Sequence, residues 1–168
     1  MWDRRPDGLR APALVCAFKG WNDAGDAASA ALTFVGAALD ATRFAQIDPE
    51  EFYDFQATRP RIELADGTTR RLQWPSVEIW EARVPRAPRD LVLLSGPEPS
   101  MRWRTFTRII VDLAEALEVQ LVVTLGALLA DVPHSRPVSI TGFATDEALR
   151  ARTDLTPSTY EGPTGITG

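Results

Sequence analysis

The chain has 168 residues and a formal net charge of -5 at pH 7. This length suffices for one domain with one substantial core. The acidic balance argues against a general nucleic-acid binder, because such proteins gain affinity by neutralising phosphates. No apolar run approaches the roughly 20 residues of a membrane-spanning helix, and the apolar run 11–18 lacks a signal-peptide cleavage pattern. We therefore expect a cytoplasmic protein that binds neither nucleic acid nor membranes.

The first predicted elements are a strand, a turn and a helix. Residues 13–18 form a continuous apolar run, which is typical of a strand covered on both faces. The polar turn 20–26 separates this run from an alanine-rich helix over 27–39. Small side chains would let that helix lie close to a sheet. Its expected apolar face consists of Ala28, Ala31, Leu32, Val35 and Leu39.

A hairpin is predicted in the middle of the chain. A strand over 44–47 leads into the irregular, aromatic stretch 48–60. Ile62 and Leu64 then alternate with polar residues before Asp66-Gly67, a pair that supplies the positive φ angles of a tight hairpin turn. Residues 71–74 form the expected return arm, and we place this hairpin at one edge of the sheet.

The remaining pattern alternates strands with helices. Strands are predicted over 77–84, 90–95, 119–125 and 138–144, and a short polar helix or turn over 145–152. A longer helix is indicated by apolar spacings of three and four, with Ser100 as its N-cap; its face contains Trp103, Phe106, Ile110, Leu113 and Leu117. The fold class is therefore α/β, in three layers, with a mainly parallel sheet and helices on both faces.

Three polar loops follow predicted strands, at residues 20–26, 96–104 and 126–136. If those strands are parallel, the loops meet outside their carboxyl ends, where open α/β sheets bind ligands. The candidate ligand-binding rim contains Trp21, Asn22, Asp23, Asp26, Glu98, Arg102, Asp131, His134 and Arg136. Asn and Asp residues also form turns and helix caps, and the single histidine can be structural or merely exposed, so both alternatives stay open.

No catalytic motif accompanies these loops. The sequence lacks a phosphate loop, a G-x-G-x-x-G turn and a G-x-S-x-G elbow, and one cysteine with one histidine cannot form a zinc cluster. No activated Ser or Cys accompanies His134. Cys16 is expected to be a small buried hydrophobe. We expect no cofactor and no metal, assign no catalytic residue, and favour a protein that is not an enzyme.

Five segments resemble the proteasome-assembly-chaperone type 2 family, in its actinobacterial branch. They are residues 20–28, 52–60, 96–99, 125–137 and 160–166 (GWNDAGDAA, FYDFQATRP, GPEP, LGALLADVPHSRP and YEGPTGI). The resemblance implies a nucleoside-phosphorylase-like fold and protein partners that include proteasome subunits. It also implies a C-terminal part beyond Gly168, so we expect residues 1–168 to be a single, C-terminally truncated domain with bare sheet edges at 119–125 and 138–144.

Two functional hypotheses follow. The first is a non-enzymatic protein-interaction or assembly factor. The alternative is a protein that binds a small molecule, such as a nucleoside or an anionic metabolite, or an enzyme with a phosphorylase-like site at the rim. The five tryptophans and the aromatic stretch 52–55 further predict a homo-oligomer, because aromatic residues are enriched at interfaces, although all of them could equally lie in the core.

Overall fold

The computed structural model describes residues 2–153 and 155–167. The chain divides into two compact units. The first, which we call the sheet unit, contains Met1–Leu128 with Gly165–Gly168, and the second contains Leu129–Thr164. Each unit is described by itself. Within the described residues, every helix is too short or too polar to cross a membrane.

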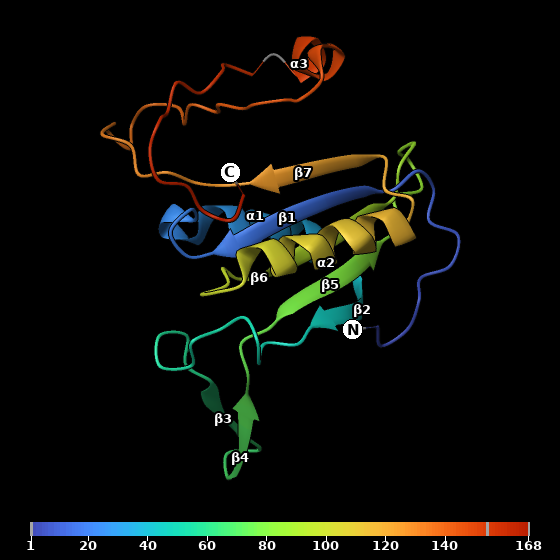
Figure 1. The fold of residues 1–168 in the computed structure, drawn as a ribbon, viewed down its shortest axis with the longest axis vertical. Coiled ribbons are helices and arrows are strands. Elements are labelled where there is room, and N and C mark those ends of the chain that lie inside the picture. Colours follow the sequence, from blue (N-terminus) through green and yellow to red (C-terminus); the bar gives the residue numbers. More distant parts are fainter. Residues whose placement is uncertain (1, 154, 168) are drawn as a thin grey trace. The chain divides into compact units, whose positions relative to one another are not determined.

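Five strands of the sheet unit form one sheet in the order β2-β5-β6-β1-β7 (Figure 1). In chain order the elements are β1 (Ala13–Lys19), η1 (Ala24–Asp26), α1 (Ala27–Ala38), β2 (Thr42–Ile47), β3 (Arg61–Ala65), β4 (Thr69–Gln73), β5 (Val77–Ala82), β6 (Leu91–Pro97), α2 (Trp103–Ala116) and β7 (Leu121–Leu125). These elements confirm most of the predicted strands and both long helices, with ends that differ by a few residues.

The sheet is mixed. β1 pairs in parallel with β6 and with β7, whereas β5 pairs antiparallel with both β2 and β6. The α/β prediction is confirmed, and antiparallel pairing takes a larger share than expected. The reason is the short connection between Ala82 and Leu91, since a parallel crossover needs a dozen or more residues.

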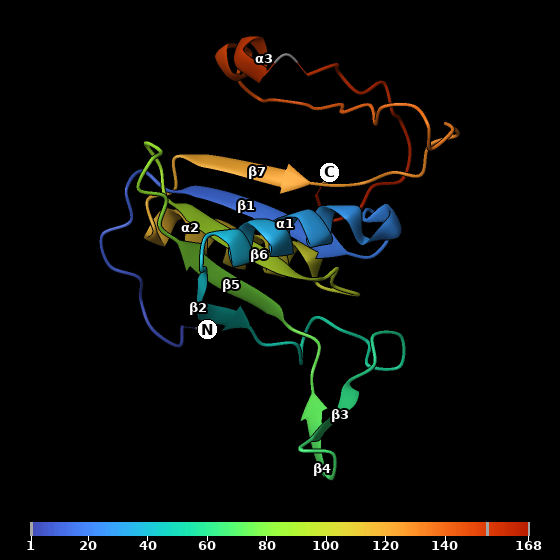
Figure 2. The same ribbon diagram turned by 180° about the vertical axis from the view of Figure 1, so that it is seen from behind.

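One helix covers each face of the sheet, as predicted. α2 lies over one face in Figure 1, and α1 lies over the opposite face in Figure 2. Side chains of β1 alternate between them: Leu14, Cys16 and Phe18 belong to the core under α2, while Val15 and Ala17 belong to the core under α1. A continuous apolar run in β1 is therefore what two covered faces require.

The buried face of α1 differs in part from the predicted one. Ala28 and Leu32 are buried as expected, but Ala31 and Val35 are exposed. The face is rotated toward Ser29, whose hydroxyl donates to the buried Asp23 carboxylate at 2.6 Å. Two polar groups that satisfy each other can thus replace an apolar side chain in the core.

The predicted hairpin forms, but not at the edge of the sheet. β3 and β4 make a separate two-stranded sheet, in which Ile62 lies opposite Leu72. Asp66 and Gly67 have φ angles of 55° and 75° at its tip, as a tight turn requires. The expectation of an edge position was wrong, because β3 and β4 pair only with each other, and β2 pairs with β5 rather than with the hairpin.

α2 has the predicted apolar face, but its start is different. Phe106 and Leu113 are buried, as is Leu117 just after the helix. Ser100 is not the N-cap; that position is held by Arg102 in a left-handed conformation. Ser100 instead contacts the loop before the hairpin, where its Oγ accepts from the Asp54 N–H at 3.2 Å and its own N–H donates to the Phe52 carbonyl at 2.8 Å.

The second unit contains α3 (Glu147–Thr153), which confirms the predicted short helix. The predicted strand over 138–144 was wrong. Its backbone makes only an isolated bridge between Thr141 and Thr156, and no strand is assigned there among the described residues. An apolar segment becomes a strand only when a neighbouring strand supplies hydrogen bonds, and within this unit one bridge is not enough.

Candidate functional site

The carboxyl ends of three parallel strands meet at one edge of the sheet unit. Lys19 of β1 is in register with Pro97 of β6, and Ala17 of β1 with Leu125 of β7. The loops after these strands therefore begin side by side, as the sequence predicted.

Asp23 has a structural role at this rim. Its buried carboxylate accepts hydrogen bonds from the N–H groups of Ala28 at 2.8 Å and Ser29 at 3.3 Å, in addition to the Ser29 hydroxyl. These donors belong to the first turn of α1, where N–H groups lack helical partners. Asp26 is exposed and makes no side-chain cap. The helix-cap alternative therefore holds for Asp23.

Asn22, in the loop after β1, connects this loop to the loop after β7 and to the segment 165–167. Its carbonyl accepts from the Ala127 N–H at 2.9 Å, and its Nδ2 donates to Thr167 Oγ1 at 2.5 Å. A Cβ at Gly126 would lie 2.5 Å from that Nδ2, so only glycine leaves room for this arrangement. The neighbouring Trp21 side chain is exposed.

Glu98 holds the same terminal segment from the other side. Its N–H donates to the Lys19 carbonyl at 2.8 Å, and its Oε1 accepts from the Ile166 N–H at 2.6 Å. A Cβ at Gly165 would lie 2.8 Å from Oε1, so glycine permits this close approach. We call Asn22, Glu98, Ile166 and Thr167 the rim clamp. Sequence analysis missed it, because residues separated by 68 and 145 positions show no local pattern.

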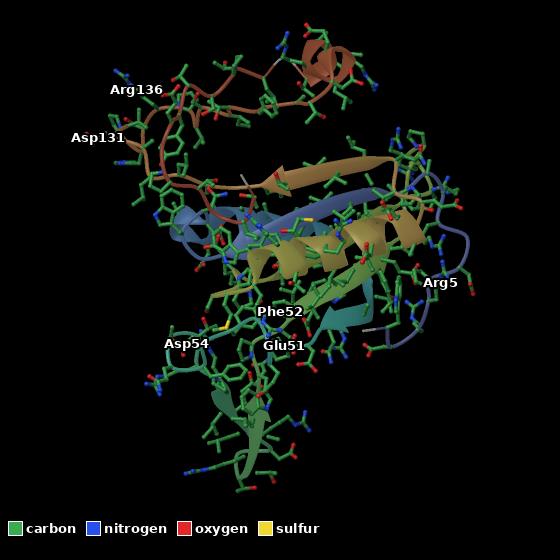
Figure 3. The ribbon with its side chains drawn as sticks, in the orientation of Figure 1. Arg5, Glu51, Phe52, Asp54, Asp131 and Arg136 are labelled. Carbon is green, nitrogen blue, oxygen red and sulfur yellow. The ribbon has the colours of Figure 1, made fainter. Side chains whose placement is uncertain are left out.

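Arg102 lies in the sheet unit and pairs with Glu51 at 2.5 Å, in an exposed position. The loop that carries Glu51 is anchored by Tyr53, whose hydroxyl donates to the Pro97 carbonyl at 2.7 Å, and by Phe52, whose ring packs edge-on against Phe106. Burial raises the pKa of Tyr53. Figure 3 shows Glu51, Phe52 and Asp54 in this loop.

Asp131, His134 and Arg136 belong to the second unit, and all three side chains are exposed there. The Arg136 N–H donates to the Pro133 carbonyl at 3.0 Å, which closes a turn. Figure 3 labels Asp131 and Arg136 in this segment. Within the part of the chain that the structure describes, no ion pair joins Asp131 to His134. No group of three or more metal-ligating side chains occurs among the described residues either.

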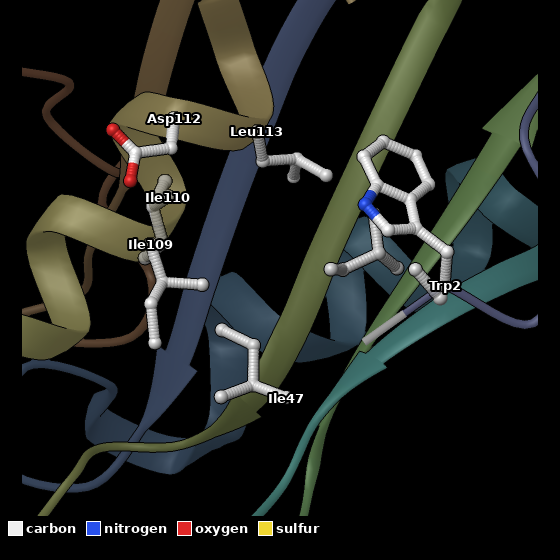
Figure 4. Close-up of a pocket in the computed structure, with 8 residues that line it drawn as sticks. Trp2, Ile47, Ile109, Ile110, Asp112 and Leu113 are labelled. Atoms are coloured by element: carbon white, nitrogen blue, oxygen red, sulfur yellow. The ribbon is translucent and has the colours of Figure 1, made fainter. Parts of the chain in front are cut away.

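Two apolar grooves flank α2. The first, which we call the Trp2 groove, has a volume of about 200 Å³ and is lined by Trp2, Ala45, Ile47, Ile79, Ile109, Ile110, Asp112 and Leu113. In Figure 4, Trp2 and Ile47 lie opposite the α2 residues. The second has a volume of about 180 Å³; Ile166 lines it together with Leu14, Cys16 and Val122. The rim clamp therefore places an apolar side chain in a groove beside α2.

A second buried carboxylate lies at the opposite end of β6. The Asp90 side chain is fully buried and accepts from Arg10 Nη2 at 2.7 Å, from the Arg10 N–H at 2.9 Å and from the Val84 N–H at 3.0 Å. The hydrogen bond from Arg10 holds the pKa of Asp90 well below its usual range. This arrangement joins the N-terminal segment to the sheet, and because its partners are distant in sequence, no local motif indicates it.

The family model for the PAC2 family matches residues 17–168. The chain belongs to the PAC2 family. The match includes all five segments from which the resemblance was inferred, and the resemblance is therefore confirmed.

Solved structures resemble this PAC2 chain closely. A PAC2 family protein from Streptomyces avermitilis is 49% identical with a TM-score of 0.85, over 92% of this chain and 66% of that one. A Mycobacterium tuberculosis proteasome-assembly chaperone homologue is 49% identical with a TM-score of 0.83, over 92% and 65%. A second M. tuberculosis protein, of unknown function, is 29% identical with a TM-score of 0.79, over 97% and 56%.

This PAC2 chain thus spans about two thirds of the length of the first two structures. No curated protein matches the sequence.

Proposed function

We propose that this PAC2 chain is a non-enzymatic assembly factor that acts in the cytoplasm by binding other proteins, with proteasome subunits as its candidate partners. The observation that carries the proposal is that the polar side chains of the rim bond to other groups of the same chain. Asn22, Asp23 and Glu98 direct their polar atoms to groups of the same chain, and both grooves described above are lined mainly by apolar side chains. Such a rim is suited to holding the chain together rather than to reacting with a substrate.

The apolar surface of the second unit supports binding to a protein. Leu129 and Phe143 are 92% and 87% exposed, and Val138 and Ile140 are also exposed. Several large apolar side chains exposed on one short segment are typical of a surface that binds another protein. The similarity to a solved proteasome-assembly chaperone homologue points to the class of partner.

Affinity purification of the tagged chain from its host tests this proposal. We expect mass spectrometry to identify proteasome subunits among the recovered proteins, and we expect Phe143→Asp to reduce their recovery. Thr145→Asp, a change of an exposed polar residue nearby, serves as the matched control and should leave recovery unchanged. Repeated recovery of no proteasome subunit and no other stable partner would contradict the proposal.

The alternative is a small-molecule binding protein, or an enzyme, with its site at the rim. One observation favours it: three parallel strands end side by side there, which is where open α/β sheets bind ligands. Isothermal titration calorimetry with nucleosides and with inorganic phosphate tests it. Saturable binding that is lost in Glu98→Gln but kept in Glu50→Gln would favour the alternative over the assembly factor.

A further inference from the structure

The chain leaves the sheet unit for the second unit and returns to it beside the same loop. Leu128 is the last residue of the sheet unit before the second unit, and Gly165 is the first residue after it. Both points adjoin the loop that follows β1, because residues next to each of them are hydrogen-bonded to that loop. The second unit is therefore a long connection whose two ends meet at the rim of the sheet unit.

The exit is fixed by backbone pairing. The Ala127 N–H donates to the Asn22 carbonyl at 2.9 Å, and the Ala127 carbonyl accepts from the Ala24 N–H at 3.0 Å. These two bonds form the parallel bridge between Asp23 and Ala127. Because they use backbone groups alone, they do not depend on which side chain occupies position 22.

The return is fixed by two side chains of the rim clamp. Asn22 Nδ2 donates to Thr167 Oγ1 at 2.5 Å, and Glu98 Oε1 accepts from the Ile166 N–H at 2.6 Å. The Ile166 side chain also packs against the main core. Asn22 thus acts at both points, since its backbone carbonyl holds the exit and its side-chain amide holds the return.

The second unit has no core with which to fix its own arrangement. None of its described residues, 129–153 and 155–164, is buried, and its described regular structure consists of α3 and the bridge between Thr141 and Thr156. Ordering a chain costs conformational entropy, which the burial of apolar side chains normally offsets. Bringing the ends of a long loop together adds a further entropic cost. Contacts within the sheet unit offset this second cost before any partner binds.

Four of the five segments that resemble the family meet at this point. The segments 20–28, 96–99, 125–137 and 160–166 supply, in turn, Asn22, Glu98, Ala127 and Ile166. They are far apart in the sequence, and the fold joins them where the ends of the second unit are held. This convergence favours a role for the point of attachment in what the chain does.

We propose that Asn22 is a positioning residue for partner binding, which holds the exit and the return together so that the second unit meets a partner as a closed, preorganised loop. The proposal rests on the proposed function, because the surface that the loop presents is the apolar one described there. The partner is a protein with an apolar surface of its own, and Asn22 does not touch it. Preorganisation raises affinity because part of the ordering cost is removed from the binding step.

Hydrogen exchange tests whether the Asn22 side chain holds the return. Asn22→Ala should accelerate exchange at Ile166 about tenfold or more and leave Ala127 unchanged, because the backbone carbonyl of residue 22 remains. Thr167→Val removes the accepting hydroxyl with little change of shape and should have the same effect. Thr68→Val, at an exposed threonine of the hairpin, is the matched control. Unchanged exchange at Ile166 in Asn22→Ala, or equal acceleration at Ala127, would overturn the proposal.

A disulfide can replace the hydrogen bond and test whether the role of Asn22 is positional. A Cβ at Gly165 would lie 3.2 Å from the Asn22 Cβ. This separation is a few tenths of an ångström below the range of about 3.5–4.5 Å found in disulfides. The double variant Asn22→Cys with Gly165→Cys should therefore close the loop when oxidised and lack the Asn22 bond when reduced, while the buried Cys16 stays unreactive.

Affinity purification then compares the two states of this double variant. The oxidised variant should recover proteasome subunits as well as the unmodified chain does, and reduction should lower the recovery about tenfold. The unmodified chain, treated with the same oxidant and reductant, is the matched control and should not change. Equal recovery in the two states, with the disulfide verified by mass spectrometry, would overturn the proposal. Failure of the two cysteines to join would contradict the closeness of the two segments on which it depends.

The positioning role and the proposed function fail in different ways. Recovery of no partner by the unmodified chain contradicts the proposed function, and with it any use of the clamp in binding. Equal recovery by the unmodified chain and by Asn22→Ala contradicts the positioning role alone. Urea denaturation separates positioning from stability: we expect Asn22→Ala to lose recovery with little change in the unfolding midpoint of the sheet unit. A loss of recovery that only accompanies unfolding would overturn the positioning role.

Discussion

The carboxylate of Glu98 accepts a hydrogen bond from the backbone N–H of Ile166 at 2.6 Å, between residues that are 68 positions apart in the sequence. Ile166 contributes its side chain to the groove beside α2, and Thr167 accepts a hydrogen bond from Asn22. One carboxylate therefore connects the loop after β6 to a segment that returns to the sheet unit from the end of the chain.

Loss of this carboxylate should release residues 165–167. We expect Glu98→Ala to accelerate hydrogen exchange at Ile166, because a hydrogen bond to a charged group contributes about 1.5–3 kcal/mol. Hydrogen exchange followed by mass spectrometry measures the effect. Glu50→Ala, at an exposed carboxylate, should leave exchange unchanged. Equal exchange in both variants would show that Glu98 does not hold the segment.

Removal of the buried Asp90 should destabilise the whole sheet unit. Asp90→Ala leaves the N–H groups of Arg10 and Val84 without their acceptor, and each buried unsatisfied group costs about 1–3 kcal/mol. We therefore expect a loss of about 2–4 kcal/mol in the free energy of unfolding, measured by urea denaturation. Asp7→Ala, at an exposed side chain nearby, should change it little. A loss equal to that control would contradict the role of Asp90.

The same residue should make stability depend on pH. The pKa of Asp90 is lowered in the folded chain, so the unfolded chain binds this proton first as the pH falls. Its contribution is fully present above the ordinary aspartate pKa, about 4, and is lost as the pH falls toward the lowered value of the folded state. Thermal unfolding between about pH 7 and pH 3 should show a smaller acid-induced loss in Asp90→Asn than in the unmodified chain. Equal acid-induced losses of stability in Asp90→Asn and in the unmodified chain would contradict this prediction.

Local sequence patterns predicted some elements better than others. The apolar run of β1 and the spacing that leads to Phe106 and Leu113 in α2 are local, so both elements could be located from the sequence. The segment 138–144 also contains apolar residues, yet Val138 is exposed and no strand forms there among the described residues, because a strand also depends on a partner that the local sequence does not specify. Polar contacts between distant residues, such as Arg10 with Asp90, leave no local signal for the same reason.

The candidate rim, too, could be predicted from the sequence only in part. Parallel strands and their loops could be predicted, because the alternation of strands and helices favours that topology. The partners of Asp23 lie within six residues, so its capping role was among the alternatives that the sequence allowed. The partners of Asn22 and Glu98 lie at the end of the chain, and only the folded chain brings them together.

Cys16 should not react while the chain is folded. Its side chain is buried under α2, and burial raises the pKa of the thiol to about 12. Only the thiolate is nucleophilic, so at about pH 8 the folded chain should resist iodoacetamide, whereas the chain in denaturant should be alkylated. Mass spectrometry of the alkylated chain measures both. Rapid alkylation without denaturant would show that the core under α2 opens readily.

Replacement by alanine should affect the free energy of unfolding differently at Gly96 and at Gly36. A Cβ at Gly96 would lie 2.5 Å from the Ser76 carbonyl oxygen and 2.6 Å from the Val77 Cα, and these backbone atoms cannot yield without moving β5. We expect Gly96→Ala to reduce the free energy of unfolding by about 1–3 kcal/mol, as overpacking does. A Cβ at Gly36 of α1 would instead meet a methyl group of Leu93 at 3.3 Å, which can shift, while alanine favours the helix by up to about 1 kcal/mol. Gly36→Ala should therefore be neutral or stabilising in urea denaturation. If both variants lose the same stability, the close approach of β5 is not the reason that Gly96→Ala is destabilising.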